Sequence, residues 1–235
     1  KTEKQIHMTQ TKDVTSFSWI SNTELLFTSK RNKPKAGTTD FYTISIEGGE
    51  AKKAFSIPKA CSVPVSLGNK LWLLTTKNPT DSKKSEPDRA VEGVDYWTFT
   101  DKPFIRDGEN FSQRRRVTLE LYQEGENITK AITPKFCEVA GIDVSSDKNR
   151  ILYTGQIYED CATPFSGLWE YHIDSGETKE LVPQGKYQIS LAKYIGKDKV
   201  MLQASTLDRS ITQNHDIFIL DLSTSEINMI ASPDG

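Results

Sequence analysis

One turn pattern recurs four times along the chain and constrains its fold more than any other feature. Each copy has a glycine or another small residue followed by a glutamate, and a segment of alternating polar and apolar residues precedes it. A short segment ending in an apolar residue follows each turn. Because successive side chains of a strand point to opposite faces, each copy predicts a β-hairpin. The turns lie at 48–50, 124–126, 175–177 and 224–226.

A second pair of predicted strands precedes each of these hairpins. These pairs are expected at 14–19 and 25–28, 63–66 and 71–75, 139–144 and 151–154, and 188–193 and 200–203. Four strands in every ~45–50 residues are the signature of a β-propeller blade. The sequence therefore predicts an all-β fold, a β-propeller fragment of about four four-stranded antiparallel blades, with one stray strand at the N-terminus.

We expect a single partial propeller domain over residues 1–235. Its blades are predicted at about 13–59, 60–135, 136–185 and 186–231, and a long insertion at about 77–113 lengthens the second. One four-stranded sheet is too small to be stable alone, so neighbouring sheets should pack face to face and bury a shared core. The residues expected in this core are Leu25, Phe27, Tyr42, Trp72, Leu74, Leu152, Trp169, Met201 and Phe218.

The insertion differs in character from the repeats around it. It begins with a polar segment, 77–89, that predicts an exposed loop, and it continues with an aromatic cluster between Tyr96 and Phe104. An Arg-Asp-Gly turn at 106–108 and three successive arginines at 114–116 follow. Long insertions on a repetitive scaffold are frequent places for function.

Six charged residues of the insertion are the candidates for contact with a substrate. An arginine fork suits a peptide carboxylate or carbonyl, and a carboxylate suits a free N-terminus. The alternative is that the residues at 107–108 only make a turn, while the arginines pair with nearby acids. The candidates are Arg106, Asp107, Glu109, Arg114, Arg115 and Arg116.

Composition and charge argue against several kinds of binding partner. The net charge is −2 and the basic clusters are short, so we expect neither nucleic acid nor a membrane surface as a partner. No apolar run approaches the ~20 residues of a membrane span. The N-terminus lacks the apolar core of a signal peptide, which suggests a cut inside a longer chain.

Three cysteines, Cys61, Cys137 and Cys161, show no metal-ligand spacing. We therefore predict no metal and no cofactor. Free thiols of a cytoplasmic protein are the expected state. A disulfide between Cys137 and Cys161 is the alternative.

Several of these segments resemble a known family. Phe17-Ser-Trp19, the strand 25–30 and Asp40-Phe-Tyr followed by the turn at 48–50 resemble propeller blades of prolyl-oligopeptidase-type serine peptidases. The insertion, with residues 102–111 and its three arginines, is similar to the acylaminoacyl-peptidase and dipeptidyl-peptidase branch. The resemblance extends over nearly the whole chain. The first blade departs from it, because Ile-Ser-Asn stands at 20–22 where the family usually has Ser-Pro-Asp-Gly.

The resemblance implies a propeller of about seven blades that covers an α/β-hydrolase domain of the same parent chain and restricts access of large peptide substrates. The catalytic residues of such enzymes belong to the hydrolase domain. This sequence has no G-x-S-x-G motif, and its histidines, His7, His172 and His215, lie in or beside predicted strands. We therefore predict a non-catalytic segment of a serine peptidase, with no catalytic residues of its own and with His172 an ordinary sheet residue.

Two other functions remain open at this point. TolB-type propellers share the blade motifs, so a stand-alone scaffold that binds a protein partner is the first alternative. A carbohydrate-active propeller is the second, and would need acids and aromatics gathered on one face. Four blades are fewer than the family uses, so we also expect exposed blade edges and a homodimer formed through them.

Overall fold

The computed structural model describes residues 14–31, 35, 37–79, 88–89, 97–98, 105–106, 109–111, 115–126, 129–206, 208 and 214–232. The predicted N-terminal strand lies outside these residues. Within them every regular element is a β-strand and neighbouring strands pair antiparallel, which confirms the predicted all-β class.

The chain divides into two compact units. The first comprises residues 1–77 and 119–131, and the second comprises residues 78–118 and 132–235. These divisions do not coincide with the predicted blade boundaries, which therefore remain a prediction. Each unit is described by itself.

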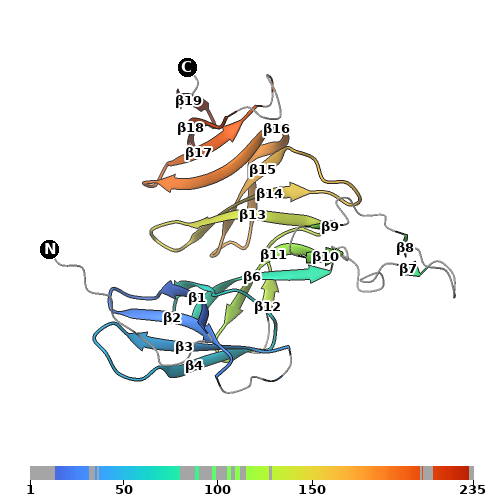
Figure 1. Ribbon diagram of the computed structural model, residues 1–235. Coiled ribbons are helices and arrows are strands. Elements are labelled where there is room, and N and C mark those ends of the chain that lie inside the picture. Colours follow the sequence, from blue (N-terminus) through green and yellow to red (C-terminus); the bar gives the residue numbers. More distant parts are fainter. Residues whose placement is uncertain are drawn as a thin grey trace. The chain divides into compact units, whose positions relative to one another are not determined.

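The first unit contains two four-stranded sheets (Figure 1). In one, the strands follow chain order: β1 (Val14–Trp19), β2 (Glu24–Ser29), β3 (Thr39–Ser45) and β4 (Lys52–Ile57). In the other, the order is β12-β11-β6-β5, from β5 (Val65–Gly68), β6 (Leu71–Pro79), β11 (Arg115–Gln123) and β12 (Thr129–Ala131). The insertion separates β6 from β11 in the chain, yet the two strands are neighbours in the sheet. Each of these two sheets thus has the four antiparallel strands that the sequence predicts for a blade.

Aromatic rings join the two sheets of the first unit. Phe55 of β4 lies with its ring centroid 4.9 Å from that of Trp72 and 6.3 Å from that of Tyr122. Both partners belong to the second sheet. Around them is one core cluster of buried residues from both sheets: Leu26, Phe41, Ile57, Trp72, Leu74 and Tyr122. This is the face-to-face packing that the sequence predicts.

The second unit contains one seven-stranded sheet in chain order. Its strands are β13 (Cys137–Val144), β14 (Arg150–Ile157), β15 (Ser166–His172), β16 (Thr178–Ile195), β17 (Lys199–Ser205), β18 (Asp216–Asp221) and β19 (Ile227–Ala231). Two blades were predicted in this region, at about 136–185 and 186–231. The strands pair in two sets of four: β13, β14, β15 and the first part of β16 form one set, and the second part of β16, β17, β18 and β19 form the other. The 18-residue strand β16 runs from one set into the other and so joins them into one sheet (Figure 1).

The backbone bends where it changes partner within β16. Val182 pairs with Leu168 and Tyr187 pairs with Ser166, so residues 183–186 have no counterpart in β15. Gly185 supplies the unusual torsion at this corner, with φ of +131°, a conformation that only glycine adopts easily. The turn residues at 183–185 therefore mark a bend and not the end of a strand.

Most of the predicted core residues are buried. Leu25 and Met201 are the exceptions and are only half-buried. They alternate with Leu26 and Leu202, which are fully buried and occupy the opposite face of their strands. Both faces of these sheets carry apolar residues, so alternation alone does not predict which face is better covered. The predicted core residues that are buried are Phe27, Tyr42, Trp72, Leu74, Leu152, Trp169 and Phe218.

The predicted repeat is visible in individual hydrogen bonds. In each set of four strands, a backbone N–H just beyond the third strand donates to a carbonyl in the turn between the first two. These 2.9 Å bonds run from Ile46 to Thr23, Glu124 to Lys70, Ile173 to Asn149 and Leu222 to Asp198. A β-bulge also recurs at the fourth residue after the turn glutamate, at Ala54, Leu181 and Ile230.

Gly155→Ala should destabilise the second unit. A Cβ at this position of β14 would overlap the backbone carbonyl of Glu138 on β13, so the two strands would have to move apart. We expect a loss of about 1–3 kcal/mol in the free energy of unfolding, measured by chemical denaturation. Gly141→Ala is the control, because its Cβ would meet only the Thr154 side chain, at 3.0 Å. Equal losses in the two variants would contradict the explanation.

Ser225→Gly should stabilise the turn before β19. Ser225 has φ of +62°, whereas glycine stands in the left-handed region at the equivalent positions 125 and 176. A left-handed residue with a Cβ costs roughly 1–2 kcal/mol, part of which glycine loses again through the unfolded chain. We expect a net gain of about 0.5 kcal/mol, and a loss of about 1 kcal/mol for the reverse change, Gly176→Ser. A gain in the free energy of unfolding in both variants would contradict the explanation that the left-handed backbone favours glycine in these turns.

Candidate functional site

The central part of the insertion forms a small hairpin in the second unit. β9 (Ile105–Arg106) pairs with β10 (Glu109–Phe111), and Arg106 and Glu109 are direct partners in this register. Two residues therefore connect the strands, as expected for a turn. Asp107 and Arg114 lie outside the described residues, as do the side chains of Arg106 and Glu109.

A second hairpin lies earlier in the insertion. β7 (Asp88–Arg89) pairs with β8 (Trp97–Thr98). The prediction of a loop throughout 77–89 is wrong at both of its ends, since β6 continues to Pro79 and β7 begins at Asp88. Strand pairing outweighs the polar composition at these positions.

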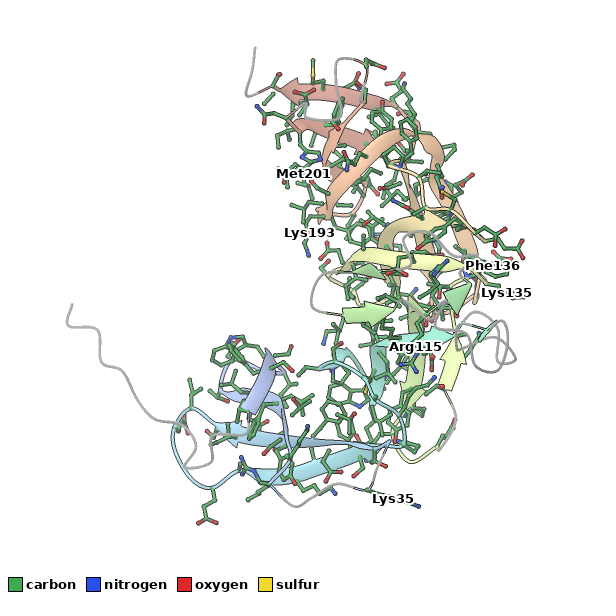
Figure 2. The ribbon with its side chains drawn as sticks, turned by 45° about the vertical axis from the view of Figure 1, so that its right-hand side comes forward. Lys35, Arg115, Lys135, Phe136, Lys193 and Met201 are labelled. Atoms are coloured by element: carbon green, nitrogen blue, oxygen red, sulfur yellow. The ribbon has the colours of Figure 1, made fainter. Side chains whose placement is uncertain are left out.

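The two described arginines at the start of β11 have opposite environments. Arg116 is 1% exposed, and its guanidinium carbon lies 4.0 Å from the ring centroid of Tyr158. Arg115 is exposed (Figure 2). Because side chains alternate along a strand, neighbouring arginines cannot share one face. Arg116 thus fixes the start of β11 by a cation–π contact, and Arg115 is left available to solvent.

A strained turn lies beside this arginine pair. The Cys137 N–H donates to the Pro134 carbonyl (3.3 Å) and closes a turn in which Phe136 has φ of +65°. The Lys135 ammonium lies 4.5 Å from the centroid of the Phe136 ring (Figure 2). The Phe136 carbonyl accepts from the Tyr158 N–H (3.2 Å). An aromatic residue in the left-handed region is uncommon, and such residues cluster at functional sites.

We call Arg115, Arg116, Lys135, Phe136 and Tyr158 the insertion base. Two contacts connect these residues: the Arg116 guanidinium lies over the ring of Tyr158, and the Tyr158 N–H donates a hydrogen bond to the Phe136 carbonyl. Two of its cations, Arg115 and Lys135, have exposed side chains. Their guanidinium and ammonium groups are suited to hydrogen bonds with a carboxylate or a carbonyl oxygen. The arrangement can therefore bind an anionic or carbonyl group, but it offers no nucleophile.

A buried charged cluster in the second unit was missed by sequence reasoning. Glu170 of β15 accepts hydrogen bonds from the Tyr194 hydroxyl (2.7 Å) and Arg150 Nη1 (3.4 Å). The Nε2 atom of His172 lies 2.8 Å from the other carboxylate oxygen. The only signal in the sequence was a glutamate inside the otherwise apolar strand at 168–171. His172 is two residues away on the same strand, but Arg150 and Tyr194 come from 20 and 24 residues away.

This cluster connects the two parts of the seven-stranded sheet. Arg150 Nη2 donates to the Lys197 carbonyl (2.9 Å), and its guanidinium carbon lies 5.1 Å from the Tyr194 ring centroid. Asp143 accepts from Lys193 Nζ (2.9 Å) and from the Tyr194 N–H (2.8 Å). Burial first, and then the hydrogen bond to Glu170, raises the pKa of Tyr194 far above its usual value. The cluster therefore braces the sheet.

Buried carboxylates of the first unit are satisfied in the same way. Glu120 accepts from Lys59 Nζ (2.6 and 2.8 Å) and from the Thr76 hydroxyl (2.9 Å). Asp40 accepts from Lys53 Nζ (2.9 Å) and the Ser56 hydroxyl (2.7 Å). Burial acts to raise the pKa of Asp40, but these hydrogen bonds hold it below the ordinary value. Such pairing is what a buried charge requires.

The described residues contain no group of three or more His, Cys, Asp or Glu side chains arranged to hold a metal. The three cysteines are free, which confirms that prediction. Burial raises the pKa of the Cys61 thiol to about 11 and that of Cys137 to about 12. These two thiols are thus protonated and weakly nucleophilic at neutral pH. No helix in the described part of the chain could cross a bilayer.

Solved structures with a similar fold are β-propellers and enzymes that contain them. The uncomplexed acylaminoacyl peptidase of Pyrococcus horikoshii matches with a TM-score of 0.55 and 18% identity, over 96% of this chain and 33% of that one. The β-propeller domain of the Trilobed protease from Pyrococcus furiosus matches with a TM-score of 0.53 and 17% identity, over 96% and 57%. This chain is a β-propeller fragment. That result confirms the predicted fold class.

A third match comes from a different class of enzyme. An oligogalacturonate lyase in complex with manganese matches with a TM-score of 0.54 and 9% identity, over 90% of this chain and 51% of that one. The propeller fragment thus spans about half, or less, of the chains that it matches. No family model matches the sequence, and no curated protein does either. Identities this low establish the fold and leave the activity open.

Tyr194→Phe should destabilise the second unit through the loss of one hydroxyl. The hydrogen bond to the Glu170 carboxylate disappears, whereas the ring stays in place against Arg150. We expect a loss of about 1.5–3 kcal/mol in the free energy of unfolding. Tyr42→Phe is the matched control, because the buried Tyr42 hydroxyl has no hydrogen-bond partner among the residues that the structure describes. The explanation fails if both variants unfold at the same denaturant concentration.

Proposed function

We propose that this chain is the non-catalytic propeller segment of a cytoplasmic serine peptidase, in which it gates or shapes the access of peptides to an α/β-hydrolase domain of the same parent chain. The fold shared with acylaminoacyl peptidase over 96% of this chain is the observation that carries the proposal. That match covers only a third of the peptidase chain, which leaves room there for a domain of another kind. The blade and insertion motifs point in the same direction.

The proposed contact with substrate is made by the insertion. Arg115 is its best described candidate, because its side chain is exposed at the insertion base. Arg106 and Glu109 are direct partners in the β9–β10 hairpin and are proposed to act together, with Asp107 and Arg114 as further candidates. The buried Arg116 would act as a positioning residue, because its stacking on Tyr158 fixes the strand that carries Arg115.

Two other functions have support of a more general kind. A stand-alone TolB-like scaffold would use the same blades to bind a protein. A carbohydrate-active propeller is favoured by the match to oligogalacturonate lyase. The parent reading frame distinguishes them from the peptidase: a G-x-S-x-G motif within a hydrolase domain supports our proposal. A parent that degrades oligogalacturonate with manganese and is not labelled by a serine-directed fluorophosphonate would refute it.

Arg115→Ala in the complete parent enzyme should weaken the binding of short peptides that end in a free carboxylate. We expect KM to rise about tenfold, the value of one good charged hydrogen bond, while kcat stays nearly constant. Peptide amides should show a smaller effect, since they carry no charge at that end. Lys35→Ala is the control, because Lys35 is an exposed cation of the first unit, outside the insertion (Figure 2).

Arg106→Ala and Asp107→Ala test the hairpin in the same assay. An unchanged kcat/KM in both variants, together with an unchanged Arg115→Ala enzyme, would show that the insertion does not touch substrate. If the propeller gates the access of peptides, residues outside the insertion would then have to do so.

A further inference from the structure

The strand β19 forms an unusual edge of the seven-stranded sheet. Among the described strands it pairs with β18 alone, and it carries no charged residue between Ile227 and Ala231. Two large apolar side chains, Met229 and Ile230, are 59% and 61% exposed. Exposed edges of this kind are templates for pairing with another strand.

The other last strands of the repeat are protected by charge. We compared the second, third and fourth residues after each turn glutamate. In β4 the second and third are Lys52 and Lys53, and in β12 the fourth is Lys130. In the first part of β16, which pairs with β15 and not with β17, Lys179 and Glu180 stand at the second and third positions. In β19 the same three positions hold Asn228, Met229 and Ile230, so this strand alone is neutral at all of them.

Met229 and Ile230 are both exposed because both faces of β19 are open, since all four residues from Asn228 to Ala231 are exposed. A bulge at Ile230 also interrupts the alternation of side chains along this strand. The same bulge occurs at Ala54 in β4 and at Leu181 in β16. The bulge therefore belongs to the repeat, and what distinguishes β19 is its lack of charge.

We propose that β19 is a self-association strand that pairs antiparallel with β19 of a second copy of this chain, about a two-fold axis at Met229. In this register Met229 faces the partner's Met229, and Asn228 faces the partner's Ile230. Ile227 faces the partner's Ala231. In this register no like charges face each other, and no charged side chain is desolvated. Pairing through β4 would instead desolvate Lys52 and Lys53. The strand is thus complementary to itself.

The size of the contact sets the strength of the dimer. Five strand residues extend over ~17 Å. This pairing buries much less than the ~1,200–2,000 Å² of stable interfaces. The dimer should therefore be weak and depend on concentration. Sedimentation equilibrium of the whole chain should show a mass that rises from the monomer value towards twice that value.

Restoring charge to the strand is the first test. The double variant Asn228→Lys/Met229→Lys copies Lys52 and Lys53 of β4 and should raise the dissociation constant at least tenfold. Ile157→Lys is the control, because Ile157 is 39% exposed on the interior strand β14; it should dimerise as the unmodified chain does. Thermal unfolding confirms that each variant is folded. A dimer that survives the double variant, or that Trp19→Lys on β1 abolishes instead, would overturn the proposal.

Cross-linking tests the register. In a Cys161→Ser background, Met229→Cys should form a disulfide-linked dimer on oxidation, because the two copies of this position face each other. Ile227→Cys should not, because its counterpart is the partner's Ala231. A chain that stays monomeric at every concentration and forms no cross-link would also overturn the proposal, whatever other protein it binds.

Discussion

The packing of one four-stranded sheet against another is the interaction on which this structure depends. In the first unit it is carried by Phe55, which contacts Trp72 and Tyr122 of the facing sheet. A sheet that is covered on both faces has little room for charge. Carboxylates such as Glu120 and Glu170 are accordingly found inside only where two or more donors satisfy them. The packing thus decides which polar side chains the interior accepts.

Local patterns predicted the hairpins well, because a turn glutamate and a period of two act over a few residues. The long strand β16 was not predicted, because Pro183 and Gly185 are normally turn residues. Here they form a bend between a part that pairs with β15 and a part that pairs with β17. The burial of Leu25 and Met201 was also overestimated, because both are only half-buried. In both cases the deciding contact comes from a sheet that the local sequence does not specify.

The candidate site shows the same limit. Alternation along a strand implies that Arg115 and Arg116 face opposite ways, but not which of them is buried. Arg116 is the buried one, and its guanidinium packs against the ring of Tyr158. Tyr158 lies 42 residues further along the chain. The Phe136 turn and the Glu170 cluster could not be predicted from the sequence either. The turn is defined by a backbone torsion, and Glu170 is bound by Tyr194 and Arg150 from other strands. The apolar edge β19, by contrast, is visible as soon as the repeats are aligned.

The hydrogen bond between Glu124 and Lys70 has a consequence for how such a protein can vary. This bond keeps the 2.9 Å length of its three equivalents although the whole insertion lies between its two residues. Each doubling of a flexible loop costs only about 0.6 kcal/mol. The connection between β6 and β11 is therefore a place where new sequence can accumulate and diverge while the sheet beneath it keeps its geometry.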